Sequence, residues 1–382
     1  DPKLRKSRGV FYTPEPVVDF IVRAVDDILK TEFNLPAGLA DTSKIKVKEK
    51  TPVVKKNHGT VYEDVEKEYH KVQILDPATG TGTFLASVIK HIYKRFEGQQ
   101  GIWGDYVDNH LIPRLNGFEL LMASYAMAHL KLDLLLSETG YKSEPGAVAT
   151  GSSFGGKDAK RFQVYLTNAL EEYHPDTGTL FASWLSTVAN EANHIKRDTP
   201  VMVLIGNPPY SVSSSNKSEW IEILMKDYKK NLDERNINPL SDDYLKFIRY
   251  GQHFIDKNGE GVLAYISNNS FLSGVIHRQV RKFLLDSFDQ IYILDLHGNS
   301  AQEERSPDGT MDENVFDIKQ GVSINIFVKT RTPRSSNRAA LKHFNMFGIR
   351  AKKYEKLLSQ SLNDTNWTVI EPKEPDYFFF PL

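Results

Sequence analysis

The tetrapeptide Asn207-Pro208-Pro209-Tyr210 follows a strongly apolar run and is the candidate reaction centre of this chain. Two consecutive prolines stiffen the turn, because each fixes its own φ and restricts the residue before it. An exocyclic aromatic amine is a poor nucleophile, since its lone pair is delocalised into the ring. The Asn207 amide and nearby carbonyls could accept both amine hydrogens and so turn that lone pair toward a methyl donor, without a general base. An ordinary strand-ending turn is the alternative interpretation.

A second candidate site is the segment DPATGTGTFL, residues 76–85, between a predicted strand and a predicted helix. Gly80 and Gly82 allow a tight turn and close approach of a ligand, and a helix N-terminus favours negative charge. Doubly wound sheets bind ligands at such strand ends. A dinucleotide fingerprint would need a third glycine where this chain has Leu85, so NAD is disfavoured. A tight turn without a ligand is the alternative.

Glu119 ends the next predicted strand and is a candidate for ribose binding. An acidic side chain at this position of a doubly wound sheet can accept hydrogen bonds from ribose hydroxyls. A solvent-facing glutamate is common at strand ends, so the assignment depends on the Gly-rich turn that precedes it.

Short apolar runs alternate with helical stretches through most of the chain. We expect helices over 15–33, 84–96 and 120–137, and strands over 72–75, 115–118, 164–166, 200–205, 261–266, 290–294 and 322–329. Strands separated by helices predict an α/β fold with a parallel, doubly wound, Rossmann-like sheet. In that sheet, the strand before Asn207 should lie beside the strand before Asp76, which would make the two candidate sites neighbours.

The candidate sites fall in a predicted catalytic domain over 1–331. Residues 41–71 are rich in lysine and predict an inserted hairpin or arm, which is either a solvated face or a contact for a DNA backbone. A polar surface loop is expected over 299–314. Residues 332–338 resemble a linker, and the aromatic tail to residue 382 predicts the start of another domain, or a segment that packs on one.

Composition excludes several classes of protein. The chain has 382 residues, 40% of them hydrophobic, and no cysteine, so disulfides, thiolate zinc sites and cysteine nucleophiles are excluded. No run approaches the roughly 18 apolar residues of a membrane span, and the start lacks a signal peptide, so we expect a cytoplasmic piece of a longer protein. The net charge of −1 does not by itself indicate a nucleic-acid partner.

Two further kinds of site are not indicated. Residues 151–158 nearly match a phosphate-binding loop, but Asp158 stands where a magnesium-binding Ser or Thr is needed. The 11 histidines show no HExxH pairing and no tight acidic cluster, so no metal site is predicted. We also find no nuclease carboxylate constellation.

The Gly-rich segment followed by Asn207-Pro208-Pro209-Tyr210 resembles the family of amino-methyltransferases that act on adenine N6, cytosine N4 or a glutamine amide nitrogen. The start of the chain, Gly9 to Pro14, resembles the element that precedes this segment in gamma-class adenine-specific DNA methyltransferases. The run from Arg5 to Lys329 is similar to the methylase region of single-chain restriction-modification enzymes of type ISP or type IIG.

This resemblance implies a set of residue roles for S-adenosylmethionine and a flipped target base. Thr13 would contact the methionine carboxylate, Glu119 the ribose, and the Thr167-Asn168 segment the adenine, although Asn168 replaces the aspartate of the family pattern. The amino-acid end of the cofactor would lie against Asp76, Pro77, Ala78, Thr79, Gly80 and Gly82. The target amine would be held by Asn207 and the Pro208 carbonyl, next to Pro209, and the target ring would lie between Tyr210 and Phe316. For Phe316 a role in the core is the alternative.

The implied function is methylation of adenine N6 in double-stranded DNA, with target recognition, and nuclease or helicase domains if present, elsewhere in the parent chain. RNA or protein glutamine methylation is the alternative within the enzyme class. A non-catalytic, cofactor-binding subunit that recognises DNA is the alternative outside it, and the intact Asn207 to Tyr210 motif speaks against that subunit. Because target choice resides largely in a separate domain, we expect this chain alone to bind DNA weakly.

Overall fold

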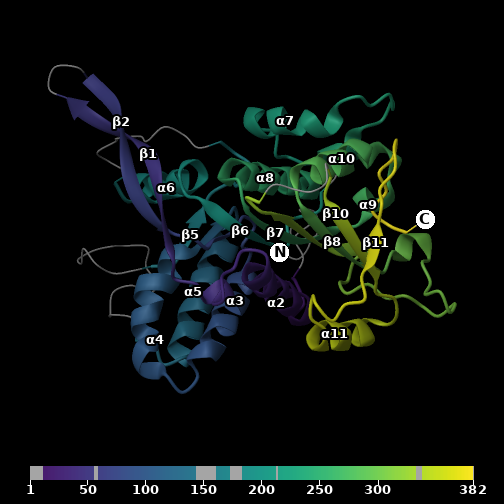
Figure 1. Ribbon diagram of the computed structural model, residues 1–382, viewed down its shortest axis with the longest axis horizontal. Coiled ribbons are helices and arrows are strands. Elements are labelled where there is room, and N and C mark those ends of the chain that lie inside the picture. Colours follow the sequence, from purple (N-terminus) through teal and green to yellow (C-terminus); the bar gives the residue numbers. More distant parts are fainter. Residues whose placement is uncertain are drawn as a thin grey trace.

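The computed structural model describes residues 12–55, 59–142, 161–172, 183–211, 214–332 and 338–381. Within these ranges, nine strands form a central sheet of order β11-β10-β8-β9-β7-β6-β3-β4-β5 (Figure 1). In chain order they are β3 (Gln73–Asp76), β4 (Leu115–Glu119), β5 (Gln163–Leu166), β6 (Val201–Gly206), β7 (Gly261–Asn268), β8 (Gln290–His297), β9 (Val322–Lys329), β10 (Ala340–Asn345) and β11 (Thr368–Ile370). The predicted α/β, doubly wound fold is confirmed.

The two strands that precede the candidate sites are neighbours, as predicted. β3 pairs with β6 in parallel, with Ile74 opposite Val203 and Leu75 opposite Leu204. All six residues of β6 are buried, which is typical of a central strand covered on both faces. The carboxyl ends of β3 and β6 therefore meet at one edge of the sheet, and β4 and β5 continue the parallel set beyond β3.

The sheet departs from the predicted parallel arrangement at β9, which pairs antiparallel with both β7 and β8 and lies between them. A parallel neighbour needs a crossover connection, which is usually a helix. Between β8 and β9 the chain forms one short 3-10 turn, Ser300–Gln302, and otherwise irregular structure. Without a crossover helix, the chain returns to the sheet in the opposite direction.

Helices cover both faces of the sheet, as Figure 1 shows. On one face lie α2 (Glu15–Thr31), α3 (Thr83–Tyr93), α5 (Met122–Glu138) and α11 (Arg350–Ser359). On the other lie α6 (Ser183–Arg197), α8 (Asp243–Asn258) and α10 (Arg278–Ser287). Shorter helices are α4 (Gln100–Tyr106), α7 (Glu219–Met225) and α9 (Ser270–Ser273). Among the described helices, none combines the length and apolar character that crossing a membrane requires.

The tail after the predicted linker joins the central sheet. β10 pairs in parallel with β8, and β11 pairs antiparallel with β10. α11 packs against α2, where the Arg23 guanidinium donates to the Leu357 carbonyl over 2.5 Å. The sheet therefore extends past the domain boundary predicted at residue 331, because β8 would otherwise expose its free edge.

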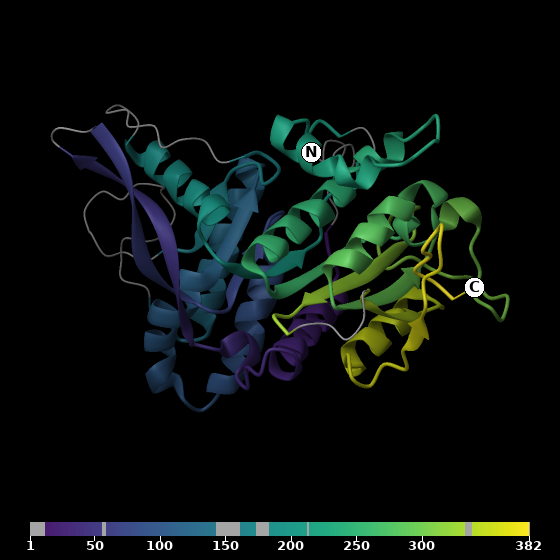
Figure 2. The ribbon, with the colours of Figure 1, turned by 45° about the horizontal axis from the view of Figure 1, so that its top comes forward.

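The lysine-rich segment forms a long antiparallel hairpin, β1 (Lys44–Lys55) and β2 (Gly59–His70), as the sequence predicted. Figure 2 shows it projecting from the body of the molecule. Among its described residues, three lysines pair across it with glutamates: Lys44 with Glu68 at 2.9 Å, Lys46 with Glu66 at 3.2 Å and Lys67 with Glu49 at 2.6 Å. These pairs neutralise part of the positive charge of the hairpin, and a contact with a DNA backbone stays a prediction.

Candidate active site

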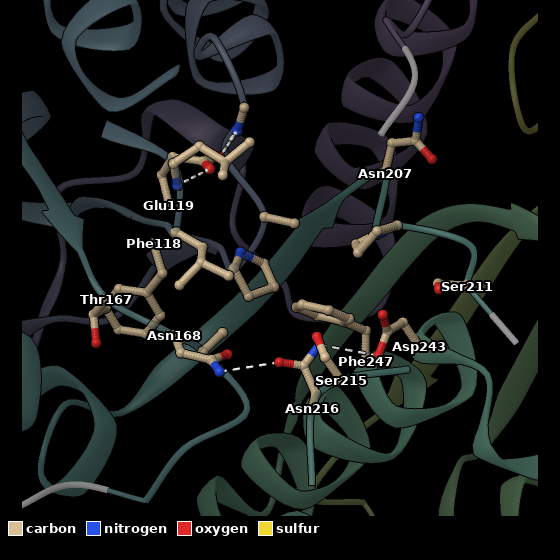
Figure 3. Close-up of a pocket in the computed structure, with 17 residues that line it drawn as sticks. Phe118, Glu119, Thr167, Asn168, Asn207, Ser211, Ser215, Asn216, Asp243 and Phe247 are labelled. Atoms are coloured by element: carbon tan, nitrogen blue, oxygen red, sulfur yellow. Dashed lines mark hydrogen bonds between the residues drawn. The ribbon is translucent and has the colours of Figure 1, made fainter. Parts of the chain in front are cut away.

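A cavity of about 260 Å³ lies at the carboxyl ends of β3, β4, β5 and β6 (Figure 3). Seven of the residues singled out in the sequence line it: Pro77, Ala78, Gly80, Glu119, Asn168, Asn207 and Pro209. The cavity continues past them to residues of the chain after β6 and of α8, namely Ser211, Ser215, Asn216, Asp243 and Phe247. The topology thus brings the Gly-rich turn, the strand-end glutamate and the Asn-Pro-Pro turn to one site.

The Gly-rich turn has the backbone that its glycines were predicted to supply. Gly80 and Gly82 have φ values of 57° and 78°, a region that favours glycine, and α3 begins directly after Gly82. Thr79 is buried inside the turn, where its N–H donates to the Phe118 carbonyl over 2.9 Å. Thr79 therefore holds the turn against β4, and Gly80 faces the cavity.

Glu119 is held by two backbone groups. Its Oε2 accepts from the Gly80 N–H over 2.7 Å, and its Oε1 accepts from the Leu121 N–H over 2.7 Å. Burial raises the pKa of the Glu119 carboxyl, and these backbone hydrogen bonds offset part of the rise. Each carboxylate oxygen keeps a lone pair, so Glu119 is oriented in advance to accept hydrogen bonds from a ligand.

Asp76 is fully buried, and only one of its two carboxyl oxygens has a hydrogen-bond partner. Its Oδ1 accepts from the Ala78 N–H over 3.1 Å, whereas Oδ2 has no hydrogen-bond partner. Burial raises the pKa of the Asp76 carboxyl to about 8. A Cβ on Gly206, at the end of β6, would lie 2.8 Å from Asp76 Oδ1, so glycine is required where the two motifs meet. An orphaned buried carboxyl oxygen fits a ligand that brings a positive charge.

The Asn207 amide is held from both sides. Its Nδ2 donates to Thr13 Oγ1 over 3.0 Å, and its Oδ1 accepts from the Tyr210 hydroxyl over 2.7 Å. Thr13, predicted to touch the cofactor, therefore contacts the reaction-centre residue, 194 positions away in the chain. One lone pair of Oδ1 stays available for a substrate amine.

Tyr210 is 9% exposed and does not line the cavity. Its ring meets Tyr244 edge-on, with centroids 6.5 Å apart, and burial raises the pKa of its hydroxyl well above the usual range. In this arrangement Tyr210 orients Asn207 through its hydroxyl. Stacking of Tyr210 on a target ring stays a prediction, and it would require the ring to leave this contact.

The N-terminus of α8 anchors the chain after the Asn-Pro-Pro-Tyr turn. Asp242 caps the helix, and its Oδ1 accepts from the Ser211 N–H over 2.8 Å. Burial raises the pKa of the Asp242 carboxyl to about 6. Sequence reasoning did not select Asp242, although an aspartate directly before a helical apolar pattern is a recognised N-cap signal.

Phe316, predicted to clamp the target base, does not line the cavity. Its side chain is 3% exposed, and its carbonyl accepts from Arg350 Nη2 over 2.8 Å. Arg350 is the first residue of α11, so the aromatic tail region holds this segment in place. The placement favours the core role that was the alternative for Phe316, and the clamp stays a prediction.

Three potential metal ligands, Glu49, His194 and Asp198, come together where the hairpin meets the end of α6. Each already has a partner: Lys67 pairs with Glu49 at 2.6 Å, the Tyr69 hydroxyl lies 2.9 Å from His194 Nε2, and Arg197 pairs with Asp198 at 2.7 Å. Because two cations face the two carboxylates, this junction fits an ion-pair network that fixes the hairpin to α6.

The segments 1–11 and 143–160 lie outside the described residues. The first contains half of the N-terminal element that resembles gamma-class enzymes, residues 9–11, and the second contains the sequence that nearly matches a phosphate-binding loop. Tyr12, Thr13 and Pro14 of that N-terminal element are described, and Thr13 reaches the site.

Comparison with known proteins finds similar chains among methyltransferases and restriction-modification enzymes. Residues 122–301 match the family model described as Eco57I restriction-modification methylase. The type II methyltransferase M.BstVI of Geobacillus stearothermophilus is 22% identical over 244 residues, which cover 62% of this chain and 36% of that protein.

Two solved structures resemble nearly the whole chain. The ATP-dependent type ISP restriction-modification enzyme LlaBIII bound to DNA is 25% identical with a TM-score of 0.74, over 97% of this chain and 22% of that one. The DrdV–DNA complex is 25% identical with a TM-score of 0.71, over 99% of this chain and 32% of that one. The chain thus spans about a third or less of the length of these relatives.

Proposed function

We propose that this chain, which is similar to methylase regions of restriction-modification enzymes, transfers a methyl group from S-adenosylmethionine to N6 of adenine in double-stranded DNA. The observation that carries the proposal is that Asn207 lines the same cavity as the Gly-rich turn and Glu119. A donor site and an acceptor site therefore share one cavity.

The residues of the cavity fit the chemical groups of this cofactor. Glu119 offers carboxylate lone pairs to the ribose hydroxyls, and Asn168 offers an amide oxygen to the adenine amine. Asp76 does not itself line the cavity, and its orphaned Oδ2 is proposed to receive the positively charged amino group of the cofactor. S-adenosylmethionine, when bound, supplies a sulfonium methyl group that is activated for in-line transfer.

The chain contributes positioning and hydrogen bonding to the reaction. Asn207 Oδ1 and the Pro208 carbonyl accept hydrogen bonds from the two N–H groups of the target amine. The lone pair of the amine then points away from these acceptors and toward the methyl group. Thr13 and Tyr210 hold the plane of the Asn207 amide. The amine needs no deprotonation before transfer, because its proton leaves to water once the new C–N bond has formed. Preorganised contacts of this kind supply catalysis through orientation.

DNA binding and target choice are proposed for the parent protein as a whole. LlaBIII and DrdV are solved with DNA, and this chain matches only part of each. We place target recognition outside this chain, with the tail after residue 338 as a packing surface for it. The lysine-rich hairpin and Phe316 are proposed contacts for DNA and for the flipped base, respectively.

The test is transfer of a radiolabelled methyl group by the full-length protein to duplex DNA, followed by sequencing of the methylated positions. We expect N6-methyladenine at a defined site and loss of transfer in Asn207→Ala, with cofactor binding retained. Duplex DNA, RNA and a glutamine-containing peptide are compared as acceptors. Cofactor binding without transfer to any adenine-containing DNA would overturn the proposal.

A further inference from the structure

Three polar side chains form a continuous hydrogen-bonded row across one end of the cavity (Figure 3). Asn168 Nδ2 donates to Asn216 Oδ1 over 3.0 Å, and Asn216 Nδ2 donates to Asp243 Oδ1 over 3.0 Å. The three residues come from the chain after β5, the chain after β6 and the first turn of α8. We call Asn168, Asn216 and Asp243 the amide row.

Asp243 determines the direction of the amide row. The side chain is 5% exposed and its Oδ1 also accepts from the Ser214 hydroxyl. Lys246, at 1% exposure, lies behind Ser214 with its Nζ 3.3 Å from Ser214 Oγ. A carboxylate accepts hydrogen bonds but cannot donate them. Asn216 must therefore turn its Nδ2 toward Asp243, which leaves its Oδ1 to face Asn168.

Asn168 is oriented as a consequence. Its two N–H groups go to Asn216 Oδ1 and to Glu171 Oε1, the latter over 3.1 Å. Its Oδ1 accepts from the Leu170 N–H over 3.1 Å and keeps a second lone pair. The amide oxygen, and not the amide nitrogen, is thus the atom of Asn168 with capacity for a ligand.

We propose that Asp243 is a positioning residue for the cofactor, which acts through Asn216 to fix the Asn168 amide so that its oxygen accepts from the 6-amino group of the cofactor adenine. This inference rests on the proposed function, and it goes beyond the resemblance, which points to the residue at 168 alone. Asn168, which would select a hydrogen-bond donor at carbon 6 of the adenine ring, is then held in place by the carboxylate of Asp243 on α8.

The same row explains why asparagine occupies position 168, where the family pattern has aspartate. With aspartate there, Asn216 would lie between two carboxylates that can only accept. The Asn216 Nδ2 could donate to either carboxylate. Its Oδ1 would then face the other carboxylate, and neither of those two oxygens can donate a hydrogen bond. Both Asn168 and Asn216 are half-buried, and we expect two facing acceptors there to weaken binding about tenfold.

The decisive experiment measures binding of S-adenosylhomocysteine by calorimetry to the full-length protein. We expect Asn168→Asp to raise the Kd about tenfold, although it restores the family residue. The double variant Asn168→Asp with Asp243→Asn should return to within about threefold of the native Kd, because Asn216 can then turn over and satisfy both ends. Glu172→Gln, which removes an exposed carboxylate near Glu171, is the matched control and should leave the Kd unchanged.

A second measurement keeps the inference testable if the double variant fails to fold. Asp243→Asn alone can donate or accept, so the amide row loses its fixed direction. We expect this variant to lose at least about threefold of the preference for S-adenosylhomocysteine over S-inosylhomocysteine, whose 6-oxo group can only accept. Equal or tighter binding by Asn168→Asp, or an unchanged preference in Asp243→Asn, would overturn the inference. Failure of the native protein to bind S-adenosylhomocysteine would instead count against the proposed function.

Discussion

Asp76 makes the stability of the cofactor-free protein depend on pH in a direction opposite to that of most carboxylates. Burial raises the pKa of its carboxyl to about 8, whereas an unfolded aspartate titrates near pH 3.9. Between these two values the folded protein holds a proton that the unfolded chain has lost. The contribution of Asp76 to stability is therefore complete below about pH 4 and is lost as the pH rises toward 8.

The size of the effect follows from the one-proton difference between the two states. The free energy of unfolding should fall by about 1.4 kcal/mol per pH unit from this group alone. Asp76→Asn removes the titration while it keeps the shape of the side chain, and its Oδ1 can still accept from the Ala78 N–H. The native protein and Asp76→Asn share all other titrating groups, so the difference between their unfolding free energies isolates Asp76.

Urea unfolding at several pH values without cofactor measures this difference. Between about pH 5 and pH 7, the native protein should lose about 3 kcal/mol relative to Asp76→Asn. If S-adenosylmethionine places its amino group against Asp76, binding near pH 7 should also release a proton, which calorimetry in buffers of different ionisation enthalpy detects. A difference in unfolding free energy that stays constant with pH would refute the reasoning about Asp76.

Two further predictions concern the buried hydroxyl of Tyr210 and the buried carboxylate of Asp26. Tyr210→Phe removes the hydroxyl that holds Asn207 and should lower kcat about tenfold with little change in the Kd for cofactor. The control is Tyr228→Phe, which removes a buried hydroxyl bonded to Gln252 and should lower stability without changing kcat. A kcat in Tyr210→Phe equal to that of the native protein would show that the hydroxyl has no part in catalysis. For Asp26, burial would raise the pKa, but hydrogen bonds from His91, Lys30 and the Leu39 N–H outweigh it and lower the pKa to about 2. The ionised form therefore stabilises the fold by about 2 kcal/mol above pH 4, and this stabilisation is lost as the pH falls toward 2. Acid unfolding of Asp26→Asn should show a correspondingly weaker pH dependence. An acid midpoint and slope identical to those of the native protein would contradict the assignment.

Local features of the molecule were predictable because they depend on short-range preferences. The apolar periodicity of 15–33 became α2, and the lysine-rich segment became a hairpin. The glycines of the Gly-rich turn take the positive φ values that the turn demands. The apolar run before Asn207 became a buried central strand, and the parallel pairing of β3 and β6 followed from the general rules of doubly wound sheets. Apart from the β3–β6 pairing, which follows from a rule of topology, each of these outcomes needs only a stretch of chain and its own backbone chemistry.

The remaining features depended on partners that lie far away in the sequence. The direction of β9, and the addition of β10 and β11 to the sheet, were decided by which strand edges stayed open once the chain had folded. Phe316 became buried because Arg350 and the tail hold its segment in place. The periodicity of apolar residues does not indicate which edge of the sheet stays open to a further strand, or which distant side chain can hold a segment in place.

By itself, the sequence singled out the residues that we propose for the chemistry: a Gly-rich turn, a strand-end glutamate and a rigid Asn-Pro-Pro-Tyr turn. Tertiary structure decided how those residues are held, with Thr13 and Tyr210 on the Asn207 amide and Asp243 behind Asn168 through Asn216. The reason is physical. A turn is set by the φ and ψ values of a few consecutive residues, whereas the direction of a hydrogen-bonded amide is set by whichever donors and acceptors the fold brings against it.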